Sequence, residues 1–178
     1  KKNNNDFEFG GDAKFVIDNS LTLDLTVNPD FSQVEVDDQI TNLTRFEISL
    51  PEKRQFFIEN SDLFSSFGDR GDSNPFFSRR IGIAKDLNGN NIQNKIIAGL
   101  RLSGKINNNL RIGVLNMLTD EDVENQIASN NNTILALQHK VFSRSNISFL
   151  FINRESIKDY DFQSDEEIFN RVLGIDYN

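Results

Sequence analysis

The sequence predicts an all-β fold built of antiparallel, up-and-down hairpins. The clearest evidence is in residues 21–27, where apolar and polar side chains alternate strictly. A strand with one apolar and one solvent-exposed face requires this alternation. Farther along the chain, short turn-forming connections alternate with long polar ones, which is typical of up-and-down sheets. No run of about 18 apolar residues occurs, so the sequence contains no membrane-spanning helix.

The first strands follow a polar, Asn-rich lead. Two strands are expected at 13–17 and 21–27, around a turn at Asp18-Asn19-Ser20, and the second ends at Pro29 because proline cannot donate to a ladder. We expect one domain or a fragment of a larger barrel, in four parts. They are a flexible lead at 1–12, a first hairpin at 13–30, an irregular insert at 31–80 and a set of hairpins at 81–178.

The insert at 31–80 is charged, irregular and rich in phenylalanine. Val36, Ile40 and Leu43 fit one side of a short helix, and a second helical turn is expected at 59–64. A connection this long between strands is usually functional or a separately packed element.

The hairpins beyond the insert are marked by Asn-rich turns, of which Asn88-Gly89 is the strongest signal. Leucine, isoleucine and valine alternate there with Arg101, Ser103, Arg111 and Gly113. Long polar loops are expected at 119–132 and 154–170. The expected strands pair 81–85 with 92–102, 94–105 with 110–118, and 133–142 with 147–153, and a last strand covers 172–177.

Two architectures fit this pattern equally well. Strands of about ten residues, with tight turns at one end and long loops at the other, are typical of a membrane β-barrel. A soluble antiparallel sandwich or meander alternates in the same way. In a barrel Leu21, Leu23, Leu25 and Val27 face lipid, whereas in a soluble module the same residues form a core.

Composition limits the partners and the chemistry. The net charge is −8 and the pI is about 4.7, which disfavours nucleic acid and anionic lipid surfaces as partners. The absence of cysteine excludes disulfides, thiolate zinc sites and cysteine nucleophiles. Tryptophan is absent and there are only 2 tyrosines, although membrane barrels usually carry girdles of both. The chain begins at Lys1 without a methionine or signal peptide, so we expect a mature or excised piece.

Two motifs resemble ligand sites and fail at defining positions. Residues 99–105 match the first part of a phosphate-binding loop, but Ile106 stands where magnesium requires Ser or Thr, and the segment alternates as a strand. Asp86, Asn88 and Asn90 have calcium-loop spacing, but Asn91 and Ile97 replace the required Gly and Glu. A hairpin turn is the better interpretation.

No catalytic, cofactor-binding or metal-binding residue is predicted. His139, the only histidine, is expected in a strand wall, and one histidine without a serine elbow or a cysteine cannot form a triad. The acidic pairs at 37–38, 121–122 and 166–167 fit solvated loops better than glycosidase carboxylates.

One charged segment is a candidate anchor. Glu52, Lys53 and Arg54 precede Phe56-Phe57, and alternating charge beside paired aromatics can pin an irregular segment to a wall through Arg–carboxylate pairs. Arg79 and Arg80 follow Phe76-Phe77 in a similar way, and we expect them to pair with acidic side chains.

Several of these segments also resemble a known family, in order and with similar spacing. They are LTLDLTVNPDFSQVE at 21–35, NLTRF at 42–46, PEKR at 51–54 before Phe56-Phe57, FSRRIG at 77–82 and LNMLTDE at 115–121. The chain resembles a family of large, uncharacterised outer-membrane β-barrel proteins of Bacteroidota-type bacteria. Members often follow a domain similar to family 9 carbohydrate-binding modules, and no such domain is found in this chain.

The resemblance implies the N-terminal part of an outer-membrane barrel whose insert folds inward or caps the lumen. The expected function is non-catalytic passage or surface handling of polymers such as glycans, without a cofactor, and with outer-membrane lipid as a partner. The alternative is a soluble β-rich binding module at the cell surface or in the periplasm. An enzyme with loop carboxylates is the third and weakest hypothesis.

Overall fold

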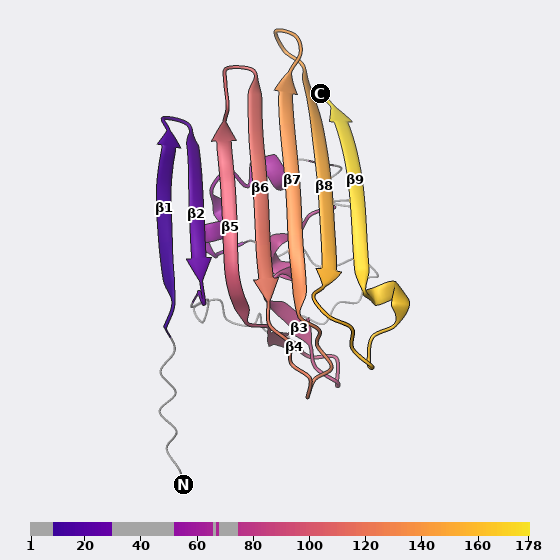
Figure 1. Cartoon of the computed structure of the whole chain (residues 1–178). Coiled ribbons are helices and arrows are strands. Elements are labelled where there is room, and N and C mark those ends of the chain that lie inside the picture. Colours follow the sequence, from indigo (N-terminus) through magenta and orange to yellow (C-terminus); the bar gives the residue numbers. More distant parts are fainter. Residues whose placement is uncertain (1–8, 30–51, 66, 68–74) are drawn as a thin grey trace.

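Seven strands form one antiparallel sheet in the computed structural model of this chain (Figure 1). The structure describes residues 9–29, 52–65, 67 and 75–178. The strands lie in the order β1-β2-β5-β6-β7-β8-β9. Their bounds are Gly11–Asp18 for β1, Leu21–Val27 for β2, Ile96–Lys105 for β5, Leu110–Thr119 for β6, Asn130–Lys140 for β7, Asn146–Ser156 for β8 and Phe169–Tyr177 for β9. The predicted all-β, up-and-down fold is confirmed.

The connections differ in length between the two ends of the sheet, as predicted. Short turns at 19–20, 106–109 and 141–145 lie at one end, and the longer connections from β2 to β5, from β6 to β7 and from β8 to β9 leave and re-enter the sheet at the other (Figure 1). We call these the turn end and the loop end. The alternation of connection lengths follows from the up-and-down order of the strands.

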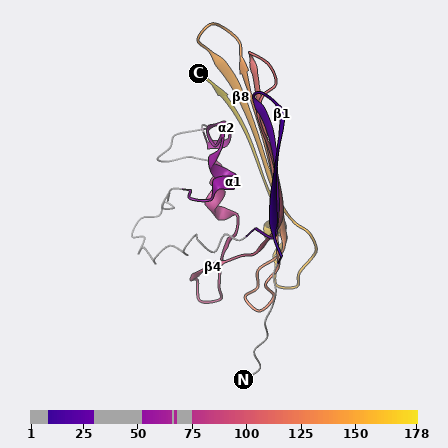
Figure 2. The ribbon, with the colours of Figure 1, turned by 90° about the vertical axis from the view of Figure 1, so that its left-hand side faces the viewer.

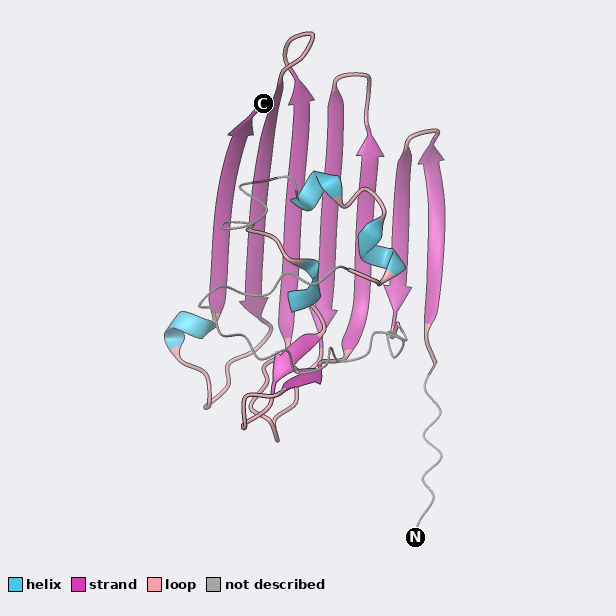
Figure 3. Ribbon diagram, turned by 180° about the vertical axis from the view of Figure 1, so that it is seen from behind, coloured by secondary structure: helices cyan, strands magenta, loops and turns pink. Residues whose placement is uncertain are grey.

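The described part of the insert lies on one side of the sheet only. It contains α1 (Gln55–Ile58), α2 (Asp62–Ser65) and the 3-10 turn η1 (Ser78–Arg80). Figure 2 shows α1 and α2 on one side of the sheet seen edge-on, and Figure 3 shows them lying across its strands. We call this side the inner face and the opposite side the outer face.

Two smaller elements lie at the loop end. The hairpin of β3 (Ile83–Lys85) and β4 (Asn91–Gln93) forms a separate two-stranded sheet. A second 3-10 turn, η2 (Asp165–Glu167), precedes β9 and has Ser164 and Glu167 as a capping box.

The strand register assigns each side chain to a face, since neighbours directly opposite one another point to the same side. Leu23 pairs with Leu102, which pairs with Val114, and this row lies on the outer face. The adjacent row, Asp24 with Arg101 and Leu115, lies on the inner face.

The core lies between the insert and the inner face. Its buried side chains are Phe57, Leu63, Phe64, Phe67 and Ile81, packed with Ile96, Leu115, Met117, Ile134, Ala136 and Leu150 of the sheet. Gly113 of β6 permits this packing, because an added Cβ would lie 2.6 Å from Cζ of Phe64. The insert therefore covers the sheet as a second layer.

Several predicted element bounds are corrected. The expected strand 92–102 is broken at Asn94 and Lys95, because the backbone N–H of Asn94 bonds to the carbonyl of Gly82 and turns the chain from β4 into β5. β1 starts two residues before the expected 13. β7 starts three residues before the expected 133 and ends before the expected 142, and β9 starts three residues before the expected 172.

The expected second helical turn at 59–64 overlaps α2, whereas α1 was not expected. The helix predicted from Val36, Ile40 and Leu43 lies outside the described residues, as do residues 1–8 of the lead.

Candidate functional site

The outer face is apolar over its central part. None of these side chains is fully buried, and no described helix lies over them (Figure 2). They include Leu23, Leu25, Leu100, Leu102, Ile112, Val114, Leu135, Leu137, Phe149, Phe151, Leu173 and Ile175. Exposed apolar patches above a few hundred Å² mark interaction surfaces in soluble proteins. We call this surface the apolar band.

On β6 to β9, polar side chains follow the apolar ones on the outer face toward the loop end. Asn116 donates from Nδ2 to Oδ1 of Asn131 at 2.6 Å and to Oγ1 of Thr133 at 2.8 Å. Arg171 donates from Nε to Oδ1 of Asn153 at 2.9 Å. The apolar band therefore has a polar border on these strands, whereas β2 and β5 stay apolar toward the loop end.

Arg101 of β5 connects the inner face to the insert. Its side chain is only 2% exposed, and Nη2 lies 2.8 Å from Oδ2 of Asp24 and 3.2 Å from Oε2 of Glu59. Nη1 donates to the carbonyls of Glu59, at 2.9 Å, and of Phe56. The buried guanidinium of Arg101 therefore binds a carboxylate of β2, a carboxylate of the insert and the carbonyl groups at the end of α1.

Lys14 of β1 completes this network. Its Nζ bonds to Glu59 and lies 3.8 Å from Oδ1 of Asp24. The hydrogen bond from Lys14, helped by the charges of Lys14 and Arg101, lowers the pKa of Glu59 below its ordinary value against the effect of desolvation. The carboxyl of Glu59 is therefore held in its charged form at neutral pH.

Arg54 forms an Arg–carboxylate pair, as predicted, but the pair does not join the insert to the wall. Its guanidinium binds Glu52 through two bonds of 2.8 Å and donates to the carbonyls of Ser78 and Ile81. It also stacks on Phe57, with Cζ 4.2 Å from the ring centroid. The predicted Arg–carboxylate pair is present, but it joins the insert to itself because Glu52 and Ser78 both belong to the insert.

Glu52 is the buried acceptor of this pair. Burial alone would raise its pKa, but the hydrogen bonds and charge of Arg54 and the hydroxyl of Ser78 outweigh burial and lower it. Arg79 is buried, at 3% exposure, whereas Arg80 lies at the surface of a hollow described next.

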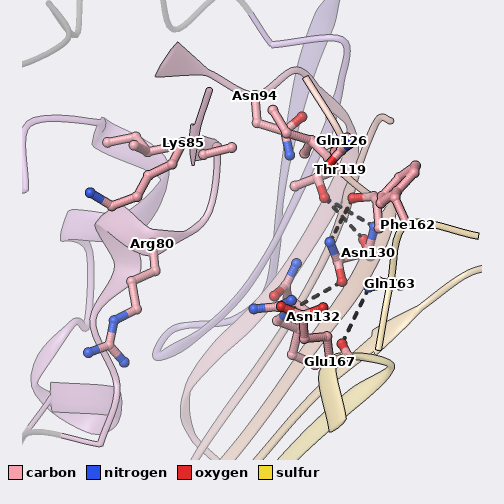
Figure 4. A pocket seen from close by; sticks show the side chains of 16 residues that line it. Arg80, Lys85, Asn94, Thr119, Gln126, Asn130, Asn132, Phe162, Gln163 and Glu167 are labelled. Atoms are coloured by element: carbon pink, nitrogen blue, oxygen red, sulfur yellow. Dashed lines mark hydrogen bonds between the residues drawn. The ribbon is translucent and has the colours of Figure 1, made fainter. Parts of the chain in front are cut away.

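A hollow of about 520 Å³ lies at the loop end, between the β3–β4 hairpin and the inner face. Arg80 and Lys85 lie on one side of it, and Asn130, Asn132, Phe162 and Gln163 lie on the other (Figure 4). The volume falls within the range of about 300–1,000 Å³ that is usual for ligand pockets.

Two long loops that border the hollow are tied to each other. Glu121 accepts from Nζ of Lys158 at 2.8 Å and from the hydroxyl of Tyr160 at 2.7 Å, and that hydroxyl also accepts from the backbone N–H of Ser129. The bond from Lys158 is the main reason that the pKa of Glu121 lies below its ordinary value. The hollow is therefore bordered by loops that are held together.

Comparison with known protein families identifies the family of this chain. The family described as Domain of unknown function (DUF5916) matches residues 1–154. The chain belongs to this family. A search of curated proteins and a search of solved structures each found no match to it. No helix among the described residues is long and apolar enough to cross a membrane.

The motifs considered in this DUF5916 chain have structural roles where the structure describes them. Asp86 accepts from the backbone N–H groups of Asn88 and Asn90, so the calcium-like spacing is a hairpin turn. Residues 99–105 lie within β5, and His139 is an exposed wall residue of β7. Within the described residues no three His, Cys, Asp or Glu side chains form a cluster that could hold a metal.

The residues of the acidic pairs have different structural roles. Glu121 joins the loop contact described above, while Asp122 bonds to Asn125 within its own loop. Glu167 caps the N-terminus of η2. The pair at 37–38 lies outside the described residues.

Sequence reasoning missed Arg101 and the hollow. A signal for Arg101 existed, since it and Asp24 both fall on the polar side of predicted strands, but pairing them requires knowledge that β2 lies beside β5 across a long insert. The hollow combines residues from η1, η2, the four strands β3, β6, β7 and β8 and the connections between elements, for which the sequence offers no local signal.

Proposed function

We propose that this chain forms part of the wall of an outer-membrane β-barrel and acts without catalysis in the passage or surface handling of polymers such as glycans. The observation that carries the proposal is the difference between the two faces of one sheet. The outer face presents the apolar band without a described cover, and the inner face is packed with ion pairs and the insert. Lipid is the solvent that matches such an outer face.

Strand length and order support the same conclusion. β5 to β9 have 10, 10, 11, 11 and 9 residues, and a membrane-spanning strand needs about 9–11. The up-and-down order with unequal ends is that of outer-membrane barrels. In this proposal the insert lies within the lumen, because it occupies the face opposite the apolar band.

The resemblance of the segments at 21–35 and 51–54 to outer-membrane barrel proteins agrees with the proposal. A soluble β-rich module at the cell surface or in the periplasm is the alternative. The buried core between sheet and insert favours it, since a two-layer domain needs that core in water as well. In that case another protein surface would have to cover the apolar band.

Cell fractionation of the full-length protein, with and without boiling before electrophoresis, separates the two functions. A barrel enters the outer-membrane fraction and changes its migration on boiling. A protein that is soluble without detergent and shows no shift overturns the proposal.

Leu23→Arg tests the apolar band directly. A charge at mid-membrane on the lipid-facing side costs about 2–4 kcal/mol, so we expect less protein in the membrane fraction. Asn153→Arg lies at the polar border, where the same charge costs about 0–1 kcal/mol, and it serves as the matched control. Equal membrane levels of the two variants count against a lipid-facing band.

A further inference from the structure

The hollow at the loop end has an unusual charge for this chain. Among the described residues that line it are three cations, Arg80, Lys85 and Arg154, and one carboxylate, that of Glu167, although the whole chain has a net charge of −8. Oε2 of Glu167 accepts from the backbone N–H and the hydroxyl of Ser164, and the charge of Arg154 helps to lower the pKa of this carboxyl, so Glu167 offsets only part of the positive charge. The hollow therefore offers positive charge to a ligand.

Arg154 of β8 supplies the best anion-binding group. Nε donates to Oδ1 of Asn130 at 3.2 Å, which fixes the plane of the guanidinium from one edge. Within the described part of the chain its two terminal nitrogens have no hydrogen-bond acceptor. Two parallel donors of this kind match the two oxygens of a carboxylate.

The remaining polar groups are neutral amides. Asn94, Gln126 and Asn132 line the hollow, and the only side-chain bond among them is a long one, 3.5 Å, from Asn132 to the carbonyl of Met117. Each amide both donates and accepts, which suits hydroxyl groups better than a bare anion.

Gln163 lines the hollow with an amide that is already bound to the protein. Its Nε2 donates to Oγ of Ser156 at 2.7 Å, and its Oε1 is buried away from the space that a ligand would occupy. The groups that can meet a ligand are therefore Arg154 and the amides of Asn94, Gln126 and Asn132. A ligand that fits both kinds of group has a carboxylate and hydroxyl groups.

Phe162 contributes an apolar surface beside these groups. The ring is half-buried, lines the hollow and packs on Tyr160 with centroids 5.0 Å apart. Figure 4 places it next to Asn130 and Gln163. An aromatic ring with amides around it can accept the C–H face of a sugar while the amides bind its hydroxyls.

We propose that this hollow binds a carboxylate-bearing saccharide, a uronate oligosaccharide, with the carboxylate on Arg154, hydroxyls on the amides and the sugar ring against Phe162. The assignment rests on the proposed handling of polymers and specifies the chemical class of polymer. The contact between Glu121, Lys158 and Tyr160 holds the loops in place before the ligand arrives, which lowers the entropy cost of binding.

Isothermal titration of the purified full-length protein in detergent tests the assignment. The probes are trigalacturonate, the neutral trisaccharide galactotriose and inorganic phosphate. We expect trigalacturonate to bind at least about 10-fold more tightly than either of the other two, because only it offers both groups.

Arg154→Gln should weaken trigalacturonate binding by about 10- to 100-fold, the effect of losing a charge-assisted pair. It should leave binding of galactotriose unchanged. Arg144→Gln is the matched control, because Arg144 is exposed in the turn at 141–145, at the opposite end of the sheet. Its affinity should equal that of the wild type.

Three outcomes overturn the inference: no binding of trigalacturonate, equal binding of the neutral sugar or of phosphate, and wild-type affinity in Arg154→Gln. Fractionation of the same preparations keeps the two proposals apart. A protein that enters the membrane with a heat-dependent shift but binds no uronate contradicts only the site, whereas a soluble protein contradicts the barrel.

Discussion

The two faces of the sheet are made by the same strands and differ in what covers them. On the outer face, Leu23, Leu102 and Val114 form a row with no ion pair and no described cover. The neighbouring residues on the same strands form a row on the inner face that is buried or nearly so: Asp24, Arg101 and Leu115. In water the apolar side of a sheet is normally the buried one.

The two faces therefore differ in their contacts within the described chain. The inner face is buried by this chain's own insert, which meets polar side chains on β2 and β5 and apolar ones on β6 to β8. The outer face is apolar and no described element covers it. The lipid-facing wall with a filled interior that we propose would account for both faces.

The largest expected effect comes from breaking the charged link on the inner face. Arg101→Gln leaves Asp24 and Glu59 without their buried partner, and removing one member of a buried pair costs about 3–5 kcal/mol. Urea unfolding of the detergent-solubilised protein, together with protease cleavage of the insert, measures this loss.

Arg111→Gln is the control for that change. Arg111 of β6 also links the wall to the insert, through Asp62 at 2.7 Å, but the two side chains are 25% and 55% exposed. A pair this exposed contributes about 0–1 kcal/mol. Equal losses in the two variants would show that burial of Arg101 is not what fixes the insert.

Much of the wall could be predicted from local sequence. β2 is found at 21–27 as expected, and the alternation around Leu100 and Leu102 assigned the correct residues to a common face. Period-two alternation is a local signal, so it needs no knowledge of the partner strand. Asn130, Asn131 and Asn132 were assigned to a loop because asparagine favours turns, yet they extend β7 by pairing with β6 and β8.

The insert and the hollow could not be predicted in the same way. Arg54 was correctly identified as the member of a charge pair, but its partner Glu52 is only two residues away. The contact between insert and sheet is made instead by Arg101 of β5, which bonds to Glu59, 42 residues away in the sequence. Long-range pairs depend on which strands are neighbours in the sheet, and a single sequence does not show which strands are neighbours.

An intermediate effect is expected where α2 meets the sheet. Gly113→Ala places a methyl group 2.6 Å from the ring of Phe64, and such overpacking costs about 1–3 kcal/mol. Gly174→Ala, on the same inner face, finds its nearest atom 3.7 Å away and should change stability by less than about 0.5 kcal/mol. Thermal unfolding compares the two, and equal midpoints would contradict close packing of α2 on β6.

The last prediction concerns pH. Because the pKa of Glu52 is lowered in the folded state, its contribution is fully present above its ordinary value of 4.5 and is lost as pH falls through the lower folded value. Glu52→Gln keeps the shape of the side chain but loses the charge that faces Arg54, so it should be less stable than the wild type by about 1.5–3 kcal/mol at pH 7, and the difference should shrink below pH 4.5. Unfolding curves at pH 7 and pH 3 measure it, and a constant difference would exclude the charge as the cause.

Site-directed spin labelling in lipid bilayers tests the lipid-facing outer face most directly. The chain has no cysteine, so Leu102→Cys, Leu137→Cys and Asn153→Cys can each carry one label in an otherwise unchanged protein. A lipid-facing band predicts that labels at 102 and 137 collide more with oxygen, which dissolves in lipid, than with a water-soluble nickel chelate, and that the label at 153 does the opposite. Labels at 102 and 137 that meet the nickel chelate as often as the label at 153 would contradict the membrane wall and leave a soluble module.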